Sequence, residues 1–234
     1  MASHLWEDFR VVVPDLQGHG LVDTQGVLQS IDTAADEVAA AIRHMRLGKV
    51  TLVGCSMGGT VAQSVALRHR DVVVQLGLIA TFAKGGQAHA NRATLAETEG
   101  VAAQLPGTLT RWFDAETLAR NGPEINYIKD VLGRTPLDRW AAAWRAMAVV
   151  DNLERLPTLD IPVLTIAGGA DSSTQDEMMR GFSTSIPYSR HVTLPDAMHM
   201  MILTHPAEIA ADLKALADDG AHSRPESFAK GRRQ

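Results

Sequence analysis

One short motif, Gly54-Cys55-Ser56-Met57-Gly58, constrains the fold of this chain more than any other segment. It follows the apolar run Val50-Thr51-Leu52-Val53 and precedes a stretch of helical character over residues 59–68. Glycines in such a motif permit a turn so sharp that a Cβ would clash with neighbouring backbone. The pattern therefore predicts a strand, a tight turn and a helix, with the Ser56 hydroxyl held out at the end of the strand.

Short β-branched runs alternate with helical patterns along much of the chain, which favours a parallel sheet with helices on both faces. Residues 31–45 place apolar side chains on one helical face, and Thr33 with Asp36 resembles a capping box at its start. A last helix is expected to begin near Pro206. The expected strands are residues 10–14, 49–54, 72–81, 162–167 and 191–194.

The middle of the chain differs from its two ends. Residues 82–159 contain several helical patterns interrupted by glycine and no convincing strand. We therefore predict an α/β core made of residues 1–81 and 160–217, with residues 82–159 inserted as a small helical cap. Residues 218–234 are polar and are expected to form a flexible tail.

The composition argues against several classes of protein. A net charge of −5 gives no electrostatic reason to bind nucleic acid. No apolar run approaches the length of a membrane span, and the N-terminus lacks the features of a signal peptide. Cys55 is the only cysteine, which excludes an intrachain disulfide and suits the reducing cytoplasm. We therefore expect a cytoplasmic enzyme that binds neither nucleic acid nor membranes.

A serine hydroxyl becomes an effective nucleophile only when a base takes its proton and a carboxylate orients that base. Asp171 and His199 each follow an expected strand, and both come after Ser56 in the order serine, acid, histidine. The carboxyl ends of parallel strands meet at one edge of a sheet, so the three side chains can converge there. The weaker candidates are Cys55 as nucleophile, Asp176 and Asp196 as acid, and His191 and His205 as base.

At these positions the chain resembles the serine hydrolases of the α/β-hydrolase fold, and within them the 3-oxoadipate enol-lactonase and carboxylesterase group. The matching segments are residues 10–20, 54–59, 161–171 and 194–201. The resemblance implies that Ser56 attacks the acyl carbon, His199 moves its proton and Asp171 orients the imidazole. It also implies that the Met57 N–H donates one oxyanion hydrogen bond. The implied activity is cleavage of a small carboxylic ester or lactone through an acyl-enzyme, with a cofactor-free perhydrolase as a sibling alternative.

One part of the family pattern is missing before residue 10. Members of this group carry a His-Gly loop after an earlier strand, and this loop supplies a second oxyanion N–H. We therefore expect an N-terminally shortened fold. Three explanations stay open: a start codon assigned too far downstream, which we favour, a deliberately shortened chain, or direct pairing of the strands at residues 10–14 and 49–54. The missing segment also motivates an alternative of another class, a non-catalytic protein that binds small ligands, and an exposed sheet edge could recruit a second copy as a homo-oligomer.

The cap offers candidates for substrate binding. Trp140 and Trp144 fall on one helical face, which indicates either ordinary packing or a lid that lines an acyl pocket. Arg111 could bind a substrate carboxylate or could simply be solvated. The chain has no Walker loop, dinucleotide-binding motif or metal-ligand spacing, so we expect no cofactor and no metal.

Overall fold

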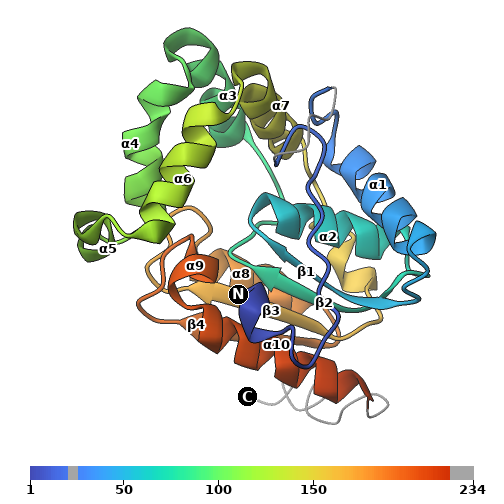
Figure 1. Cartoon of the computed structure of the whole chain (residues 1–234). Coiled ribbons are helices and arrows are strands. Elements are labelled where there is room, and N and C mark those ends of the chain that lie inside the picture. Colours follow the sequence, from blue (N-terminus) through green and yellow to red (C-terminus); the bar gives the residue numbers. More distant parts are fainter. Residues whose placement is uncertain (21–25, 222–234) are drawn as a thin grey trace.

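The computed structural model describes residues 1–20 and 26–221, and its centre is a parallel sheet with the strand order β1-β2-β3-β4 (Figure 1). The predicted α/β architecture with a parallel sheet is confirmed. Four of the five expected runs form it, and their bounds are β1 Val50–Cys55, β2 Val73–Ile79, β3 Val163–Gly168 and β4 Ser189–Leu194.

Helices cover both faces of the sheet, so its central strands are buried on both sides. One face packs against α1 (Ile31–His44), α2 (Met57–Arg68) and α8 (Asp176–Ser185). The other face packs against α10 (Pro206–Ala221), and the short helix η1 (Ala2–His4) contacts α10. In Figure 1, α1 and α2 lie above the sheet and α10 lies below it. This burial explains why the strands read as continuous apolar runs.

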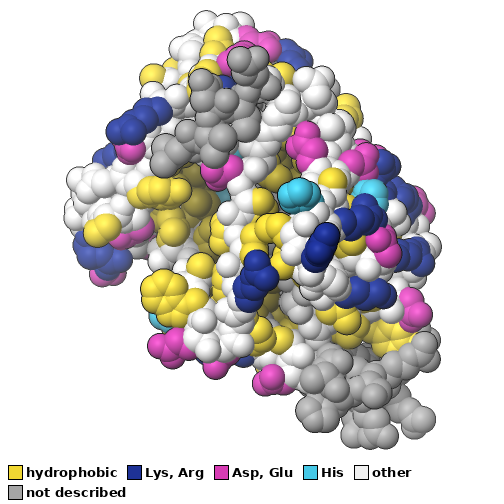
Figure 2. Space-filling model, turned by 45° about the vertical axis from the view of Figure 1, so that its right-hand side comes forward, with side chains coloured by type: hydrophobic (Ala, Val, Ile, Leu, Met, Phe, Trp, Pro, Cys, Tyr) yellow, Lys and Arg dark blue, Asp and Glu magenta, His cyan; other side chains and the backbone are white. Residues whose placement is uncertain are grey.

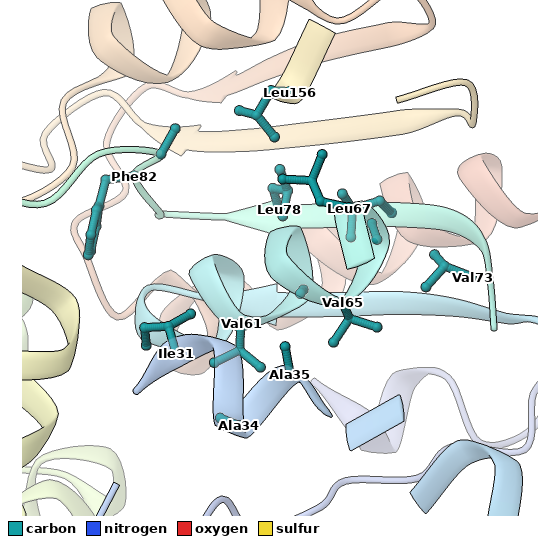
Figure 3. Packing of buried hydrophobic residues seen from close by; sticks show 14 of the residues in the cluster. Ile31, Ala34, Ala35, Val61, Val65, Leu67, Val73, Leu78, Phe82 and Leu156 are labelled. Atoms are coloured by element: carbon teal, nitrogen blue, oxygen red, sulfur yellow. The ribbon is translucent and has the colours of Figure 1, made fainter. Parts of the chain in front are cut away.

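Helix α2 lies between α1 and the sheet. Its Val61 and Val65 face the small residues Ala34 and Ala35 of α1, as Figure 3 shows. Small side chains on α1 let the two helices approach closely, and all four of these residues are buried. The packing fixes α2, and with it the turn at Ser56 from which α2 starts.

Two predicted helix starts have different outcomes. Helix α10 begins at Pro206, as predicted. The cap of α1 is Ser30 instead of Thr33, because the Ser30 hydroxyl accepts the Thr33 N–H at 2.9 Å. An N-cap of this kind stabilises a helix by about 1 kcal/mol.

The first expected strand was predicted wrongly. Residues 10–14 belong to no strand, and no backbone hydrogen bond is recorded for them within the described part of the chain. The exposed fractions of Val12 and Val13 are 42% and 77%. Figure 2 views the molecule with the side that carries α1 nearer to the reader. Hydrophobic side chains lie in the middle of the surface seen in this view. A strand needs a neighbouring strand about 4.8 Å away, and no pairing of residues 10–14 is recorded within residues 1–20 and 26–221.

A cavity of about 600 Å³ lies between residues 10–14 and β1. Val38 and Ile42 of α1 line it from one face of the sheet, and Leu213 of α10 lines it from the other. The cavity therefore runs along the outer edge of β1, for which β2 is the one strand partner among the described residues. Direct pairing of residues 10–14 with β1, one of the three explanations above, does not occur in this structure.

Residues 82–159, for which we keep the name cap, are mainly helical, and no strand is assigned in this range. Its helices are α3 Gln87–Glu99, α4 Val101–Trp112, α5 Ala115–Arg120, α6 Pro123–Arg134 and α7 Leu137–Ala148, followed by η2 Leu156–Thr158. Phe113, Ile125 and Ile128 are buried at the centre of this group. Met200 and Leu203 pack against the same cluster from the loop and short helix α9 (Met201–Thr204) that follow β4. The cap therefore contacts the segment that carries His199.

The end of the chain differs from the prediction in one respect. Helix α10 continues to Ala221, so the tail expected from residue 218 begins inside a helix. The remainder of that tail, residues 222–234, lies outside the described residues. Within the described ranges, no helix is long and apolar enough to cross a membrane.

Candidate active site

Ser56 lies at the turn between β1 and α2 in a strained backbone conformation, with φ 51° and ψ −119°. A residue with a Cβ rarely adopts a positive φ, so the surroundings must hold it there. The Ser56 N–H donates to the Ile79 carbonyl at 2.9 Å, and the Ser56 carbonyl accepts the Thr81 hydroxyl at 2.7 Å. These bonds to the end of β2 and the loop after it fix the predicted turn in its strained form.

Two glycines make this turn sterically feasible. A Cβ on Gly54 would collide with the backbone of Gly58, and a Cβ on Gly59 would collide with the Thr81 side chain. Strand and helix therefore approach more closely than larger residues would permit. The backbone crowding predicted for the glycines of the motif is confirmed at Gly54 and is wrong at Gly58, where a Cβ would meet no atom within 4 Å.

The structure brings the three predicted side chains together. His199 Nε2 lies 2.9 Å from Ser56 Oγ, and His199 Nδ1 lies 2.8 Å from Asp171 Oδ2. Ser56 follows β1, Asp171 follows β3 and His199 follows β4, so all three lie at the carboxyl end of the sheet. The side chains of His199 and Asp171 are almost completely buried. The result is one continuous hydrogen-bonded chain from carboxylate to hydroxyl.

Asp171 is held as a carboxylate despite its burial. Burial alone would raise the pKa of this carboxyl, but the hydrogen bond and charge of His199 and further hydrogen bonds lower it below its ordinary value. The further donors are the Thr174 hydroxyl at 2.5 Å and the Ser173 N–H at 2.7 Å. A carboxylate only accepts hydrogen bonds, so His199 Nδ1 carries the proton and Nε2 offers its lone pair to Ser56.

Thr174 was missed by the sequence reasoning. Its spacing from Asp171 offered one signal, because an aspartate in a loop commonly binds the hydroxyl and N–H groups that follow it in a turn.

The weaker candidates lie elsewhere. Cys55 packs on the α10 side of the sheet, and burial together with the charge of Asp171 raises the pKa of its thiol to about 12. Asp176 begins α8 and pairs with His191 at 2.8 Å. His205 Nδ1 lies 2.8 Å from the neighbouring Thr204 hydroxyl. No hydrogen bond is recorded between any of these side chains and Ser56 or His199.

The cap contacts the loop of His199 directly. The Met200 N–H donates to the Trp112 carbonyl at 3.2 Å, and the ring centroids of Trp112 and His199 are 6.0 Å apart. Trp112 ends α4, so this helix terminus lies beside His199. Trp112 was not among the substrate-binding residues predicted from the sequence.

The three predicted substrate-binding residues lie in the same cap. Trp140 and Trp144 meet edge to face with their ring centroids 5.8 Å apart. Trp140 is buried and its indole N–H has no hydrogen-bond partner among the described residues, whereas Trp144 is half-buried. Arg111 is half-buried and donates to the Thr108 hydroxyl at 3.1 Å.

The described residues include no group of His, Cys, Asp or Glu side chains that could hold a metal ion. The site itself is formed by the Asp171, His199 and Ser56 side chains. These can hold a carboxylate, a neutral imidazole and a hydroxyl in line, which is an arrangement for activating the hydroxyl as a nucleophile.

Comparison with known proteins finds enol-lactonases and esterases among the proteins that this chain resembles. It is 28% identical to 3-oxoadipate enol-lactonase 2 of Acinetobacter baylyi over 174 residues, which cover 74% of this chain and 65% of that protein. The chain thus spans less than two thirds of the length of this relative.

Two solved structures are similar over more of the chain. A thermophilic esterase from Thermogutta terrifontis, in a malate-bound structure, is 32% identical with a TM-score of 0.85, over 93% of this chain and 83% of the esterase. The enol-lactonase of Burkholderia xenovorans LB400 is 26% identical with a TM-score of 0.86, over 92% of this chain and 84% of the enol-lactonase. The family description that matches the chain covers residues 1–212, so the protein belongs to the alpha/beta hydrolase family.

Proposed function

We propose that this protein is a serine hydrolase that cleaves a small carboxylic ester or lactone through an acyl-enzyme. The observation that carries the proposal is the hydrogen-bonded chain from Asp171 through His199 to Ser56, with distances of 2.8 and 2.9 Å. The enol-lactonase and esterase among its relatives support the same class of substrate.

The reaction would begin when His199 Nε2 takes the Ser56 proton as Oγ attacks the carbonyl carbon. Asp171 stabilises the imidazolium that forms, and its lowered pKa keeps it ionised for this role. His199 then gives the proton to the leaving alcohol, and the acyl group stays on Ser56. Water, activated by the same imidazole, releases the acid and restores the serine.

The charge on the carbonyl oxygen needs hydrogen-bond donors in the intermediate. Met57 is the first residue of α2, and the first N–H groups of a helix have no acceptor within the helix. We assign the Met57 N–H as one oxyanion donor. A single donor of this kind contributes about 10²–10³ to the rate.

The cap would cover the acyl part of the substrate. Trp140 and Trp144 would supply apolar contact and Arg111 a charged contact, as expected from the sequence. The contact of Trp112 with His199 supports this placement, because it sets the cap beside the reacting groups.

The test is hydrolysis of p-nitrophenyl butyrate together with labelling by a fluorophosphonate probe. Ser56→Ala is expected to abolish labelling and to lower kcat by about 10⁴-fold or more. Cys55→Ala is the matched control, because it removes the neighbouring thiol and leaves the hydroxyl, so labelling is expected to persist. Full activity of Ser56→Ala would overturn the proposal.

Two other results would point to the alternatives. Ligand-induced thermal stabilisation without turnover or labelling would favour a non-catalytic ligand-binding protein. Peroxide-dependent halogenation that requires Ser56 would favour a perhydrolase.

A further inference from the structure

Two turns of the chain share the same local hydrogen bonds between an aspartate and the threonine three residues later. The Thr174 hydroxyl donates to Asp171 Oδ2 at 2.5 Å, and the Thr117 hydroxyl donates to Asp114 Oδ2 at 2.7 Å. In both turns the threonine N–H donates to Oδ1 of the same carboxylate, at 3.2 and 2.8 Å. Both threonines are buried. The two turns therefore differ mainly in what else their carboxylate contacts.

The difference lies in the contact of Asp171 with the histidine of the proposed site. The Asp114 carboxylate caps α5, whereas Asp171 Oδ2 also lies 2.8 Å from His199 Nδ1. The Thr174 hydroxyl oxygen lies 3.4 Å from the same Nδ1 atom. Asp171 Oδ2, Thr174 Oγ1 and His199 Nδ1 thus form a triangle of polar atoms, and all three residues are buried. Thr174 therefore contacts the acid and the base at once.

The hydrogens of this triangle have only one favourable arrangement. A threonine hydroxyl carries one hydrogen, and an ionised carboxylate can only accept, so the Thr174 hydrogen lies toward Asp171. The Thr174 oxygen then turns a lone pair toward His199 Nδ1. An Nδ1 atom without a hydrogen would face lone pairs of both oxygens, whereas Nδ1–H meets two acceptors. The triangle therefore favours the imidazole with its hydrogen on Nδ1, which leaves Nε2 free to accept from Ser56.

The two oxygens of the Asp171 carboxylate are held in different ways. Oδ1 accepts the backbone N–H groups of Ser173 and Thr174, whereas Oδ2, the oxygen beside His199, accepts the Thr174 hydroxyl. Burial would raise the pKa of Asp171, and the hydrogen bond and charge of His199 together with the Thr174 hydroxyl lower it. Loss of the hydroxyl alone would leave the backbone bonds to Oδ1 in place. A substitution of Thr174 can therefore release the one oxygen that orients the imidazole.

We propose that Thr174 is a positioning residue of the active site, whose hydroxyl holds Asp171 Oδ2 against His199 Nδ1 and so fixes the imidazole for its work on the nucleophile. This inference rests on the proposed hydrolase function and adds a fourth side chain to the site. Thr174 contacts no reacting atom in this role and acts through Asp171 and His199. Its effect therefore falls on kcat and leaves KM nearly unchanged.

The first test is the kinetics of p-nitrophenyl butyrate hydrolysis. Thr174→Val removes the hydroxyl and keeps the shape, and kcat is expected to fall by about 10- to 100-fold because a hydrogen bond to a charged group is lost. Thr174→Ser keeps the hydroxyl and is expected to retain most of kcat. Thr117→Val is the matched control, because it removes the corresponding bond to Asp114 in the other turn and should leave kcat unchanged. Urea denaturation of both valine variants measures the structural cost of each lost bond.

The second test needs no catalysis and uses the protein without substrate. Proton NMR detects the hydrogen-bonded Nδ1–H of His199, and loss of its signal in His199→Gln identifies it. In Thr174→Val this signal is expected to shift and to exchange faster with water, because Asp171 Oδ2 is no longer held. Thr174→Ser and Thr117→Val should leave it in place. This result would support the inference even if no ester were cleaved, which separates it from the proposed function.

Three results would overturn the inference: an unchanged kcat in Thr174→Val, an equal loss of kcat in Thr174→Ser and Thr174→Val, or an Nδ1–H signal that is the same with and without the hydroxyl. If Thr174→Val did not fold, Thr174→Ala would be measured in its place, because alanine also lacks the hydroxyl and is smaller than threonine.

Discussion

β1 and β4 are the two outer strands of one parallel sheet, and each leads to a residue of the proposed catalytic chain. The two strands differ in the contacts that their side chains make with the elements around them. Side chains of β4 bind the elements around it. His191 and Thr193 contact Asp176 of α8 at 2.8 and 2.6 Å, and Arg190 reaches Asp212 of α10 at 3.3 Å. This outer strand is thus fixed by polar residues that it carries itself.

The Thr51 hydroxyl of β1 donates to Gln75 of β2 at 2.7 Å, but the outer edge of β1 borders the apolar cavity, and no hydrogen bond across this edge is recorded among the described residues. Its carboxyl end is nevertheless well fixed, because Gly54 packs against Gly58 and the Ser56 backbone binds the end of β2 and the following loop. The difference shows that contacts on the β2 side can hold the nucleophile while the other edge stays open. Fixing the end of a strand and covering its outer edge are therefore separate requirements. The position of Ser56 depends on fixing the end of β1.

The largest expected effect tests the contact at the end of β1. Gly54→Ala would place a methyl group against the Gly58 backbone, which cannot move without shifting α2. We expect a loss of about 3 kcal/mol in the free energy of unfolding. We also expect a loss of about 100-fold in kcat/KM, because the nucleophile is displaced. Urea denaturation and hydrolysis of p-nitrophenyl butyrate measure the two quantities.

Gly58→Ala is the matched control from the same motif. A Cβ at this helical position would meet no atom within 4 Å, so alanine is expected to be neutral or to stabilise the protein by about 0.5–1 kcal/mol. If both variants lost stability and kcat/KM equally, the close approach of β1 and α2 would not be the reason that the motif requires glycine.

Local sequence was sufficient to predict which residues lie together at the carboxyl end of the sheet. Ser56, Asp171 and His199 could be predicted because each follows a strand, and the carboxyl ends of parallel strands lie at one edge. The three consecutive valines from Val11 to Val13 were equally strand-like, and there the prediction failed. A strand forms only when a second backbone lies beside it, and no local pattern in residues 10–14 reports whether that neighbour is present.

The cap shows a second limit of sequence reasoning. Arg111 could be suspected from its type alone, but Arg92 of α3 belongs to no motif, and only the folded cap reveals that no acidic partner is recorded for either among the described residues. Whether an arginine is paired depends on which helices pack together.

The next prediction tests the hydrogen bonds between the side chains of β4 and Asp176 of α8. Burial alone would raise the pKa of Asp176, but hydrogen bonds from Thr193, His191 and Arg180 lower it to about 2. A lowered pKa stabilises the folded protein above the ordinary value near 3.8, and this stabilisation is lost as the pH falls through about 2. Asp176→Asn should therefore cost about 1–2 kcal/mol at pH 7, a range that allows for solvent screening of the partly exposed carboxylate.

Urea denaturation between pH 7 and pH 2 measures this difference, which should shrink below about pH 4. Asp130→Asn serves as the control, because its pair with Arg134 is exposed on a cap helix and should contribute less than about 0.5 kcal/mol. A constant difference between the native protein and Asp176→Asn at every pH would show that the β4 network does not depend on the charge of Asp176.

The smallest expected effect concerns the segment beside the open edge of β1. Val13 is 77% exposed and lies in no strand, so Val13→Lys should change the free energy of unfolding by less than about 0.5 kcal/mol. Val73→Lys provides the contrast, because Val73 is buried in β2 and a charge there would lose its hydration. Urea denaturation of both variants gives the comparison. If Val13→Lys destabilised the protein by several kcal/mol, residues 10–14 would be covered in solution, and the contrast between β4, whose side chains bind α8 and α10, and the open edge of β1 would no longer hold.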